Sequence, residues 1–297
     1  MIIPTMPETT QLRLSDWGVI RAQGADAASF LHGQLTQDFA LLDRDHARLA
    51  GFCTAKGRLL ATMVGWRGGD DEILLALPAD TLAATLKRLS MFVLRAKCKL
   101  SDASAEFAVY GLLGTAPAEP WTLQRDGAAV QVSLPGPGRA LRIQAAAEVP
   151  PAAATMSAED WAWAEADAGQ AWVRAATVEA FVPQMINFEV LGGVNFKKGC
   201  YPGQEIVARS QYRGTLKRRL QVFETDATAS IGQEIFHGAD PEQPAGVVAG
   251  SGSRGGVTRL TAEIKLAALD GGSLHLGSAS GPALRLRPLP YEIPPQD

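Results

Sequence analysis

The order of strand-like and helix-like segments constrains the fold of this chain most strongly. Short apolar segments bounded by turn residues are typical of strands, and they occur at 48–53, 58–67, 72–77, 93–100 and 106–112. Between the third and the fourth of these, Leu82, Leu86 and Leu89 recur at helical spacing and predict an amphipathic helix over 78–92. Strands, a helix and further strands in this order favour a ferredoxin-like α+β unit.

Two further helices are predicted outside this unit. A short strand is expected around Trp17, and Asp26 is placed to cap a helix after it. Ser157 and Asp160 form a capping-box pattern that starts another helix, which we expect to stop at Gly169.

The segment from Arg218 onward consists of short strand-like stretches and Gly/Pro turns, of which Asp270-Gly271-Gly272 is the clearest. This pattern predicts a small all-β barrel or sandwich. With 297 residues and 46% apolar residues, the chain is long enough for two or three domains with sizeable cores.

Charge and cysteine content exclude several classes of protein. A net charge of −3 does not indicate that the whole molecule is attracted to nucleic acid. Cys53, Cys98 and Cys200 are odd in number and far apart, which argues against a disulfide framework and favours a reducing compartment. Because the sequence has no Cys-x-x-Cys pair or Cys/His cluster, no metal site is predicted.

The same sequence predicts a cytoplasmic location. The N-terminal residues lack the apolar core of a signal peptide. No apolar run approaches the ~20 residues that span a membrane. No long heptad pattern or large apolar face calls for a dimer, so a monomer is expected.

The run Lys198-Gly199-Cys200-Tyr201-Pro202-Gly203-Gln204-Glu205 carries most of the functional information. Gly199 and Gly203 let the backbone take positive φ or come close to a ligand. Cys200 at the tip of such a turn, beside two lysines, has the surroundings of a reactive or redox-active thiol, or of a labile ligand to an iron–sulfur species. The alternative is a small, inert turn residue.

The neighbours of this cysteine also have two interpretations. Gln204 and Glu205 are placed to orient Cys200 or a ligand through hydrogen bonds. Otherwise they are polar turn residues that lead into a strand over 206–208. Tyr201 is placed to stack on a ligand ring, or else to anchor the turn by packing.

The segment 196–209 closely resembles the signature of the YgfZ family, K-G-C-Y-x-G-Q-E, and every fixed letter of it is present. The members of this family are folate-binding proteins related to the glycine cleavage T-protein, an aminomethyltransferase. The resemblance runs from Asp16-Trp17 to Pro288-Leu289-Pro290-Tyr291. It implies an α+β, T-protein-like folate-binding fold with a ferredoxin-like portion and a small C-terminal β-barrel.

The resemblance also implies a division into domains. A discontinuous folate-binding domain, 1–47 plus 146–216, carries the K-G-C-Y-P-G-Q-E loop. A ferredoxin-like α+β domain is inserted at 48–145, and a β-barrel domain covers 217–297.

Trp17 and Trp161 stand where the family places its folate-contacting tryptophans. A flat pterin binds well against indole faces in a mostly apolar pocket, although the residues alone do not distinguish these two from the other tryptophans, whose ordinary role is core packing. The resemblance implies tetrahydrofolate or a derivative between the domains, with Cys200 near the mouth of the pocket. The residues expected to shape the surroundings of the thiol are Lys198, Gln204 and Glu205.

A basic stretch overlaps the same run and has only one acid, Glu205. It is suited to the phosphates of RNA or to the carboxylate tail of a folate, and Tyr201 and Tyr212 within it mildly favour nucleic acid. The alternative is an ordinary solvated face. Its cations are Lys197, Lys198, Arg209, Arg213, Lys217, Arg218 and Arg219.

One departure from the T-protein pattern bears on the class of function. Aminomethyltransferases of this type carry a run resembling N-x-x-G-G-x-x-D-D, in which an Asp assists one-carbon chemistry. Here the two Asp positions are Ala61 and Thr62, neither of which can carry a proton as a carboxylate does. Whether the chain is an enzyme therefore stays open, and the pattern argues against the transferase reaction.

The leading hypothesis is a folate-binding accessory protein that supports the assembly or repair of iron–sulfur enzymes, including those that thiolate tRNA. Its expected partners are folate and iron–sulfur enzymes or assembly proteins. The alternatives are a folate-dependent one-carbon transferase and a module that binds tRNA directly.

Overall fold

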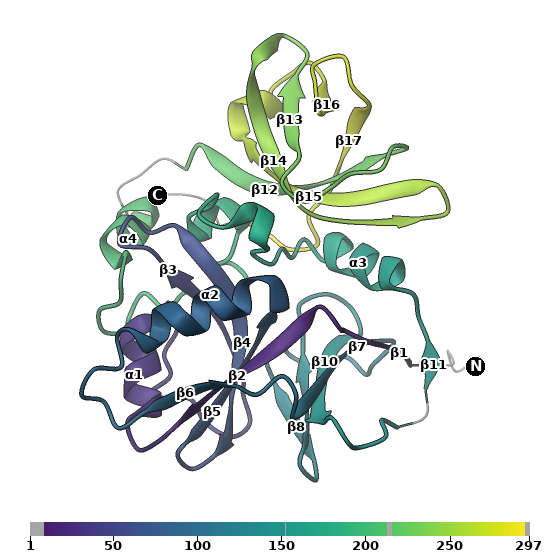
Figure 1. Cartoon of the computed structure of the whole chain (residues 1–297). Helices are drawn as coiled ribbons and strands as arrows, with labels where there is room; N and C mark the ends of the chain where they lie inside the picture. Colours follow the sequence, from purple (N-terminus) through teal and green to yellow (C-terminus); the bar gives the residue numbers. More distant parts are fainter. Residues whose placement is uncertain (1–8, 152, 213–215, 295–297) are drawn as a thin grey trace.

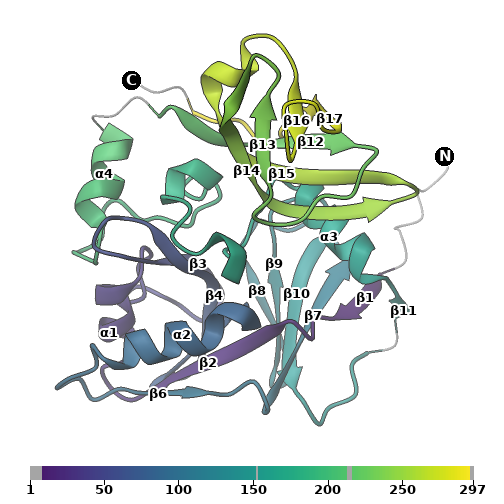
Figure 2. The same cartoon turned by 45° about the horizontal axis from the view of Figure 1, so that its top comes forward.

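The structure of the protein is a computed structural model that describes residues 9–151, 153–212 and 216–294. The chain forms a five-stranded sheet, a six-stranded sheet and a closed barrel (Figure 1). The barrel lies on one side of the two sheets, and helix α3 (Ala158–Asp167) lies between it and the six-stranded sheet in both views (Figures 1 and 2). Residues 1–8, where no signal peptide is expected, and Arg213 lie outside the described residues.

The five-stranded sheet is antiparallel and contains the ferredoxin-like portion. Its elements are β2 (Trp17–Gln23), α1 (Ala27–Gln34), β3 (Arg48–Cys53), β4 (Leu59–Gly69), β5 (Glu72–Pro78), α2 (Ala79–Ser90) and β6 (Lys99–Asp102). The spatial order is β3-β4-β5-β2-β6. Strands β2, β4, β5 and β6 with the two helices therefore make the βαββαβ unit, and β3 extends its edge. The predicted helix over 78–92 is confirmed.

Both faces of this sheet are buried. Ile20, Leu31 and Leu75 belong to an apolar cluster on the side of α1 and α2, while Val19 and Val64 belong to the cluster shared with the six-stranded sheet. Burial on both sides explains why the sequence of β5 is a continuous apolar run and does not alternate.

The six-stranded sheet carries the platform on which α3 rests. Its strands are β1 (Thr10–Arg13), β7 (Phe107–Leu113), β8 (Leu123–Asp126), β9 (Ala129–Ser133), β10 (Arg139–Ala145) and β11 (Ala154–Thr155), in the order β11-β1-β7-β10-β9-β8. At Gly111 in β7 an added Cβ would lie 2.7 Å from the ring of Trp161, so the glycine lets the indole of α3 lie directly on the strand. The capping box of Ser157 and Asp160 is present, and the chain leaves α3 through Gly169 at φ +62°.

The predicted insert 48–145 does not coincide with one sheet. Strand β2 and helix α1 precede residue 48 yet belong to the five-stranded sheet, and β7 to β10 belong to the six-stranded sheet. The boundary at residue 47 thus passes through the ferredoxin-like portion, which spans residues 17–102.

The C-terminal strands close into the predicted barrel. They are β12 (Arg218–Thr225), β13 (Glu234–His237), β14 (Asp240–Arg254), β15 (Val257–Lys265), β16 (Leu274–Leu276) and β17 (Ala283–Arg287). Strand β17 pairs back onto β12, and Phe223, Ile235 and Leu260 fill the interior. Short 3-10 turns occur at η1 (Ala175–Thr177), η2 (Pro183–Ile186) and η3 (Leu266–Leu269).

One secondary-structure prediction at the signature run is wrong. The strand expected over 206–208 is part of helix α4 (Gln204–Tyr212). Of that short apolar run only Val207 is fully buried, so the residues follow helical and not strand burial. No helix in the described ranges is long and apolar enough to cross a membrane.

Tyr291 fastens the segment after the barrel to the end of α3. Its hydroxyl donates a hydrogen bond to the carbonyl oxygen of Gly169 (2.8 Å) and accepts one from Asn187 Nδ2 (3.2 Å). The Asn187 amide also donates to the carbonyl oxygen of Leu220 in β12 (3.0 Å). These bonds join the barrel, α3 and the η2 turn into one unit.

Candidate functional site

Lys198 anchors the signature loop to the end of α1. Its side chain is buried, and Nζ donates to the carbonyl oxygens of His32 (2.5 Å) and Leu35 (2.9 Å). These are carbonyls at the C-terminal end of α1, where a cation also offsets the helix dipole. Burial lowers the pKa of the ammonium to about 8, against the opposing effects of Asp38 and Cys200.

Tyr201 and Gly203 press the loop against the β3–β4 turn. Tyr201 is buried, with its ring 4.6 Å from Lys198 Nζ, and burial raises the pKa of its hydroxyl. Gly203 has φ +83°, and a Cβ there would lie 2.3 Å from the carbonyl oxygen of Thr54. Only glycine fits this approach. Tyr201 thus anchors the turn by packing, and its predicted contact with a ligand stays a prediction.

Cys200 is the exposed cysteine of the chain, whereas Cys53 and Cys98 are buried. Burial raises the pKa of both buried thiols, that of Cys53 to about 12. A thiolate forms easily only where water or a cation stabilises it. The chain therefore presents one accessible thiol, held at the surface by the buried residues on either side of it.

Gln204 and Glu205 open helix α4. Among the hydrogen bonds of the described residues, none joins either side chain to Cys200. A carboxylate in the first turn of a helix is favourable by itself, since it faces the positive end of the dipole. Their predicted role in shaping the thiol's surroundings stays a prediction.

Trp17 and Trp161 are both buried, with exposed fractions of 6% and 4%. The ring of Trp17 meets that of Trp172 edge to face, with centroids 4.9 Å apart. Trp161 lies under the guanidinium of Arg139, 5.2 Å from the ring centroid. Neither indole N–H has a hydrogen-bond partner among the described residues.

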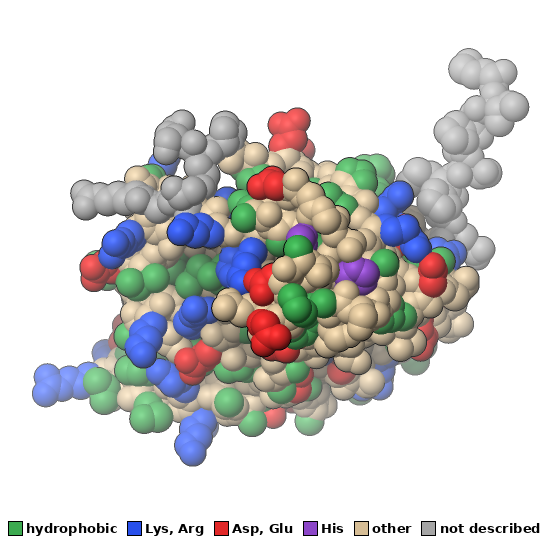
Figure 3. Space-filling view, turned by 90° about the horizontal axis from the view of Figure 1, so that it is seen from above, with side chains coloured by type: hydrophobic (Ala, Val, Ile, Leu, Met, Phe, Trp, Pro, Cys, Tyr) green, Lys and Arg blue, Asp and Glu red, His purple; other side chains and the backbone are tan. Residues whose placement is uncertain are grey.

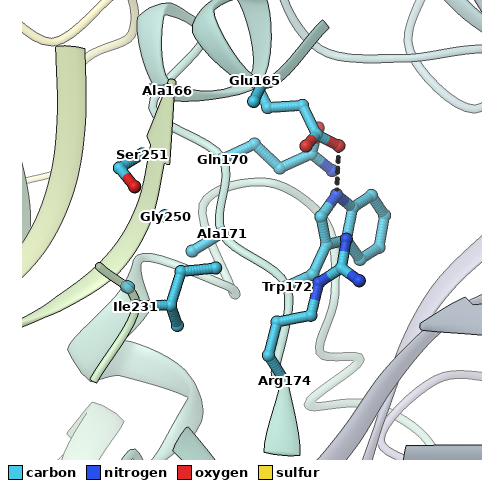
Figure 4. A pocket seen from close by; sticks show the side chains of 11 residues that line it. Glu165, Ala166, Gln170, Ala171, Trp172, Arg174, Ile231, Gly250 and Ser251 are labelled. Carbon is cyan, nitrogen blue, oxygen red and sulfur yellow. Dashed lines mark hydrogen bonds between the residues drawn. The ribbon is translucent and has the colours of Figure 1, made fainter. Parts of the chain in front are cut away.

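A small cavity lies between α3 and the barrel, and of these three tryptophans Trp172 lines it. It holds about 80 Å³. Figure 4 shows Glu165, Gln170, Trp172 and Arg174 along one side and Gly250 of β14 along the other. Trp172 Nε1 donates to Glu165 Oε1 (2.7 Å). Burial raises the pKa of Glu165, although Arg139 and Arg174 oppose this.

Arg139 lies next to Glu165 and Gln170, on the buried side of these residues. Its Nη1 donates to the carbonyl oxygen of Pro135 (2.7 Å) and to Gln170 Oε1 (3.1 Å), and its Nη2 lies 4.0 Å from Glu165. Complete burial lowers the pKa of the guanidinium to about 10. Its Nε and Nη2 and the amide nitrogen of Gln170 have no hydrogen-bond partner in the part of the chain that the structure describes. Unpaired buried donors are uncommon in proteins and call for an explanation.

The structure does not bring Trp17 and Trp161 to the wall of one cavity. Trp17 borders an open cleft of about 570 Å³ with Arg13 and Phe107, whereas Trp161 is covered by Gly111 and Arg139. The two indoles are instead linked through the buried polar cluster of Arg139, Glu165, Gln170 and Trp172.

Sequence reasoning missed this polar cluster. One signal was available, because Glu165 follows Trp161 by four residues and so shares its face of the helix. Arg139 carries no such signal, since its burial depends on contacts with α3. Among the described residues, no group of three or more His, Cys, Asp or Glu side chains is arranged to hold a metal ion.

The sequence of the chain was compared with those of known proteins to identify its family. No family model matches it. The tRNA-modifying protein YgfZ of Sodalis glossinidius (strain morsitans) is 30% identical, over 96% of this chain and 93% of that protein. The chain belongs to the YgfZ family. A YgfZ protein of Escherichia coli O157:H7 (strain EC4115 / EHEC) is 28% identical, over 74% of this chain and 73% of its own length.

A solved structure shares the fold of this YgfZ-family chain. The glycine cleavage system aminomethyltransferase T of Bartonella henselae superposes with a TM-score of 0.73, over 95% of this chain and 86% of that one, at 15% sequence identity. Identity at this level shows the fold alone. The predicted α+β, T-protein-like fold with its C-terminal barrel is confirmed.

The basic stretch of this YgfZ-family chain is smaller on the surface than its sequence predicts. Arg219 is buried and paired with Glu189, and Arg218 donates to Glu263 (2.7 Å). The burial of Arg219 contradicts its assignment to an anion patch, whereas Arg218 is partly exposed and its assignment stays a prediction. Lys and Arg side chains do gather on one side of the face viewed from the barrel (Figure 3). Among the described residues, the exposed cations of the predicted patch are Lys197, Arg209 and Lys217.

The two positions where the transferase pattern has aspartates are fully buried here. Ala61 and Thr62 both lie in β4 with no exposed surface. The Thr62 hydroxyl accepts a hydrogen bond from the Val173 N–H (2.9 Å), so it is used to hold the segment after α3. Thr62 therefore serves the packing of the fold.

Proposed function

We propose that this chain binds tetrahydrofolate or a derivative and supports, through Cys200, the assembly or repair of iron–sulfur enzymes, including those that thiolate tRNA. Support comes from its YgfZ relatives, which are named as tRNA-modifying proteins. It comes also from the fold shared with an aminomethyltransferase. The proposal includes a cytoplasmic, monomeric protein.

The observation that carries the folate proposal is the set of unpaired donors around the buried cluster. Trp17, Trp161, Arg139 and Gln170 leave five nitrogen atoms without hydrogen-bond partners among the described residues, and of these four residues Gln170 lines the cavity. A pterin presents a carbonyl oxygen and ring nitrogens that accept hydrogen bonds, and an amino group that Glu165 can accept from. A ligand of this kind in the cavity would meet Gln170 and Glu165, and would reach the other unpaired donors only after the cavity has enlarged.

Binding requires the cavity to enlarge. Its volume of about 80 Å³ is below the few hundred Å³ that enclose a ligand of drug size. Arg174 is the side chain best placed to move, because it borders the cavity and is held to the partly exposed Asp16 by an ion pair of 2.6 Å. The Asp16 end of this pair is exposed to water, which weakens the attraction that holds Arg174 in place.

A fluorescence titration with tetrahydrofolate tests the proposal. We expect saturable quenching in the wild type and weaker binding in Trp17→Phe and Trp161→Phe. Trp163→Phe is the matched control, since this indole lies on the same helix but stacks on Arg259 of the barrel, 4.8 Å away. Equal affinity in all three variants, or no quenching in the wild type, would remove folate from the proposal.

One observation favours the transferase alternative. Glu165 is a buried carboxylate with a raised pKa in a cavity, and such groups can act as general acids or bases. Incubation with tetrahydrofolate and an aminomethyl donor decides the matter. Methylene-tetrahydrofolate formed by the wild type and not by Glu165→Gln would establish the transferase.

A further inference from the structure

His32 is held in one orientation at the end of α1. Its Nδ1 lies 3.0 Å from Asp38 Oδ1. Asp38 is itself fixed, because Oδ1 also accepts from the Leu41 N–H (2.9 Å). Burial would raise the pKa of Asp38, but the hydrogen bonds from Leu41, His32 and Ala40, together with the charge of a protonated His32, outweigh it and the pKa is lowered. In the tautomer that carries the proton on Nδ1, this N–H donates to the Asp38 carboxylate and Nε2 is the acceptor of the ring.

The signature loop is wrapped around this histidine. Lys198 Nζ donates to the carbonyl oxygen of His32. A Cβ added at Gly199 would lie 3.4 Å from His32 Nε2, so the ring nitrogen lies against the residue bonded to Cys200. Nε2 has no hydrogen bond to any described residue. Nε2 of the Asp38–His32 pair therefore lies beside Gly199, the residue that precedes the exposed Cys200.

We propose that His32 takes the thiol proton of Cys200 and that Asp38 holds the imidazole in the orientation and tautomer for this transfer. The S–H bond breaks, an Nε2–H bond forms, and the resulting thiolate faces an imidazolium balanced by Asp38. Lys198 adds a second positive charge that interacts with Cys200. A nucleophile, a base and a group that orients the base are the parts of an activated thiol.

His32 and Asp38 act through Cys200 and are positioning residues. The inference deepens the proposed function, since it supplies the thiolate that the proposed role of Cys200 requires. It does not depend on folate or on an iron–sulfur client for its test. Failure of the test would therefore leave the folate titration standing, and the reverse also holds.

The test is the rate of alkylation by iodoacetamide at pH 7 and pH 10. The thiolate attacks the methylene carbon, an S–C bond forms and iodide leaves. Because Cys53 and Cys98 are buried, the native protein is labelled at Cys200, and Cys200→Ser should abolish the label. At pH 10 most exposed thiols are ionised without help, whereas at pH 7 only a few per cent are.

We expect His32→Gln to slow alkylation about five- to tenfold at pH 7 and less than about twofold at pH 10, because only the neutral-pH rate depends on the base. Asp38→Asn should give a smaller loss with the same pH dependence. His46→Gln is the matched control, since His46 makes a similar pair with Asp43 (2.9 Å) at another surface.

Two results would overturn the proposal. One is an equal slowing at pH 7 and pH 10, which indicates that His32 only shapes the loop. The other is a wild-type rate at pH 7 no faster than that of an unstructured cysteine peptide. The comparison between the wild-type protein and the peptide uses no variant. It can therefore refute the proposal even if His32→Gln folds poorly.

Discussion

Replacing Lys198 by Met tests whether the loop carries a buried ammonium. In the folded protein, burial lowers the pKa of this group from 10.5 to about 8. The unfolded chain restores the ordinary value, so between these two pKa values it binds more protons than the folded protein. The free energy of unfolding of the wild type therefore rises with pH through this window.

The magnitude follows from the two pKa values. Linkage gives a destabilisation by the ammonium of about 3 kcal/mol at pH 7, which falls to about 1.5 kcal/mol at pH 9.5. Met keeps an unbranched chain over Tyr201 and removes the titration. Relative to Lys198→Met, the wild type should gain about 2 kcal/mol between the two pH values.

Urea unfolding followed by tryptophan fluorescence measures this difference. Lys197→Met is the matched control, because Lys197 is the exposed neighbour and its replacement should change stability equally at both pH values. If the difference between the wild type and Lys198→Met is the same at pH 7 and pH 9.5, the ammonium is not desolvated in the loop and the reasoning fails.

Three further predictions concern the loop and its surface. Gly203→Ala should lower the free energy of unfolding, measured in urea, by about 2–4 kcal/mol, because φ is positive and neighbouring backbone atoms block the methyl group. The control is Gly127→Ala, where φ is also positive but the space is open, and it should lower the free energy of unfolding by only about 1 kcal/mol. Equal losses in the two variants would contradict this prediction. Cys200→Ala should abolish support of iron–sulfur enzymes, measured as thiolated tRNA in a complemented strain, while its free energy of unfolding changes by less than about 0.5 kcal/mol. Full thiolation of tRNA in this strain would remove the thiol from the proposed function. If tRNA binds directly, its affinity in filter binding should fall in Lys197→Ala and Arg209→Ala, and the affinity should depend less steeply on salt concentration. Arg218→Ala should leave this salt dependence unchanged, because Arg218 is paired with Glu263. A less steep salt dependence in the Arg218 variant would show that this pairing is not kept.

Local sequence predicted the elements whose burial has a simple period. Helix α2 buries Leu82 and Leu89 on one face, and this spacing is visible in the sequence. Helix α4 was predicted as a strand because Ile206, Val207 and Ala208 form a run too short to distinguish the two periods. Asp26 was expected to cap α1, but its carboxylate accepts from the Lys97 N–H across the fold, a partner that no local pattern indicates.

In the candidate site, too, local features could be predicted from the sequence, whereas contacts between distant residues could not. The exposed Cys200 and the tight turn at Gly203 could be predicted, because glycine and the polar run are local signals. Two other contacts could not be predicted, since they join residues far apart in sequence: the pairing of Arg219 with Glu189 and the contact of His32 with the loop. Burial of Arg219 changes its role from phosphate binding to packing, and only the fold reveals this.

The bond between Tyr291 and Gly169 has a consequence for synthesis on the ribosome. The elements of the ferredoxin-like portion are complete at residue 102, although the face of its sheet that packs on the six-stranded sheet is covered only after residue 145 has been made. The wall of the cavity beside α3 is fastened only after residue 291 has left the exit tunnel. Once Trp172 has been synthesised, the nascent chain carries an unfastened Glu165 cluster until residue 291 has emerged, and in this interval the cluster is most accessible to a ligand or a chaperone.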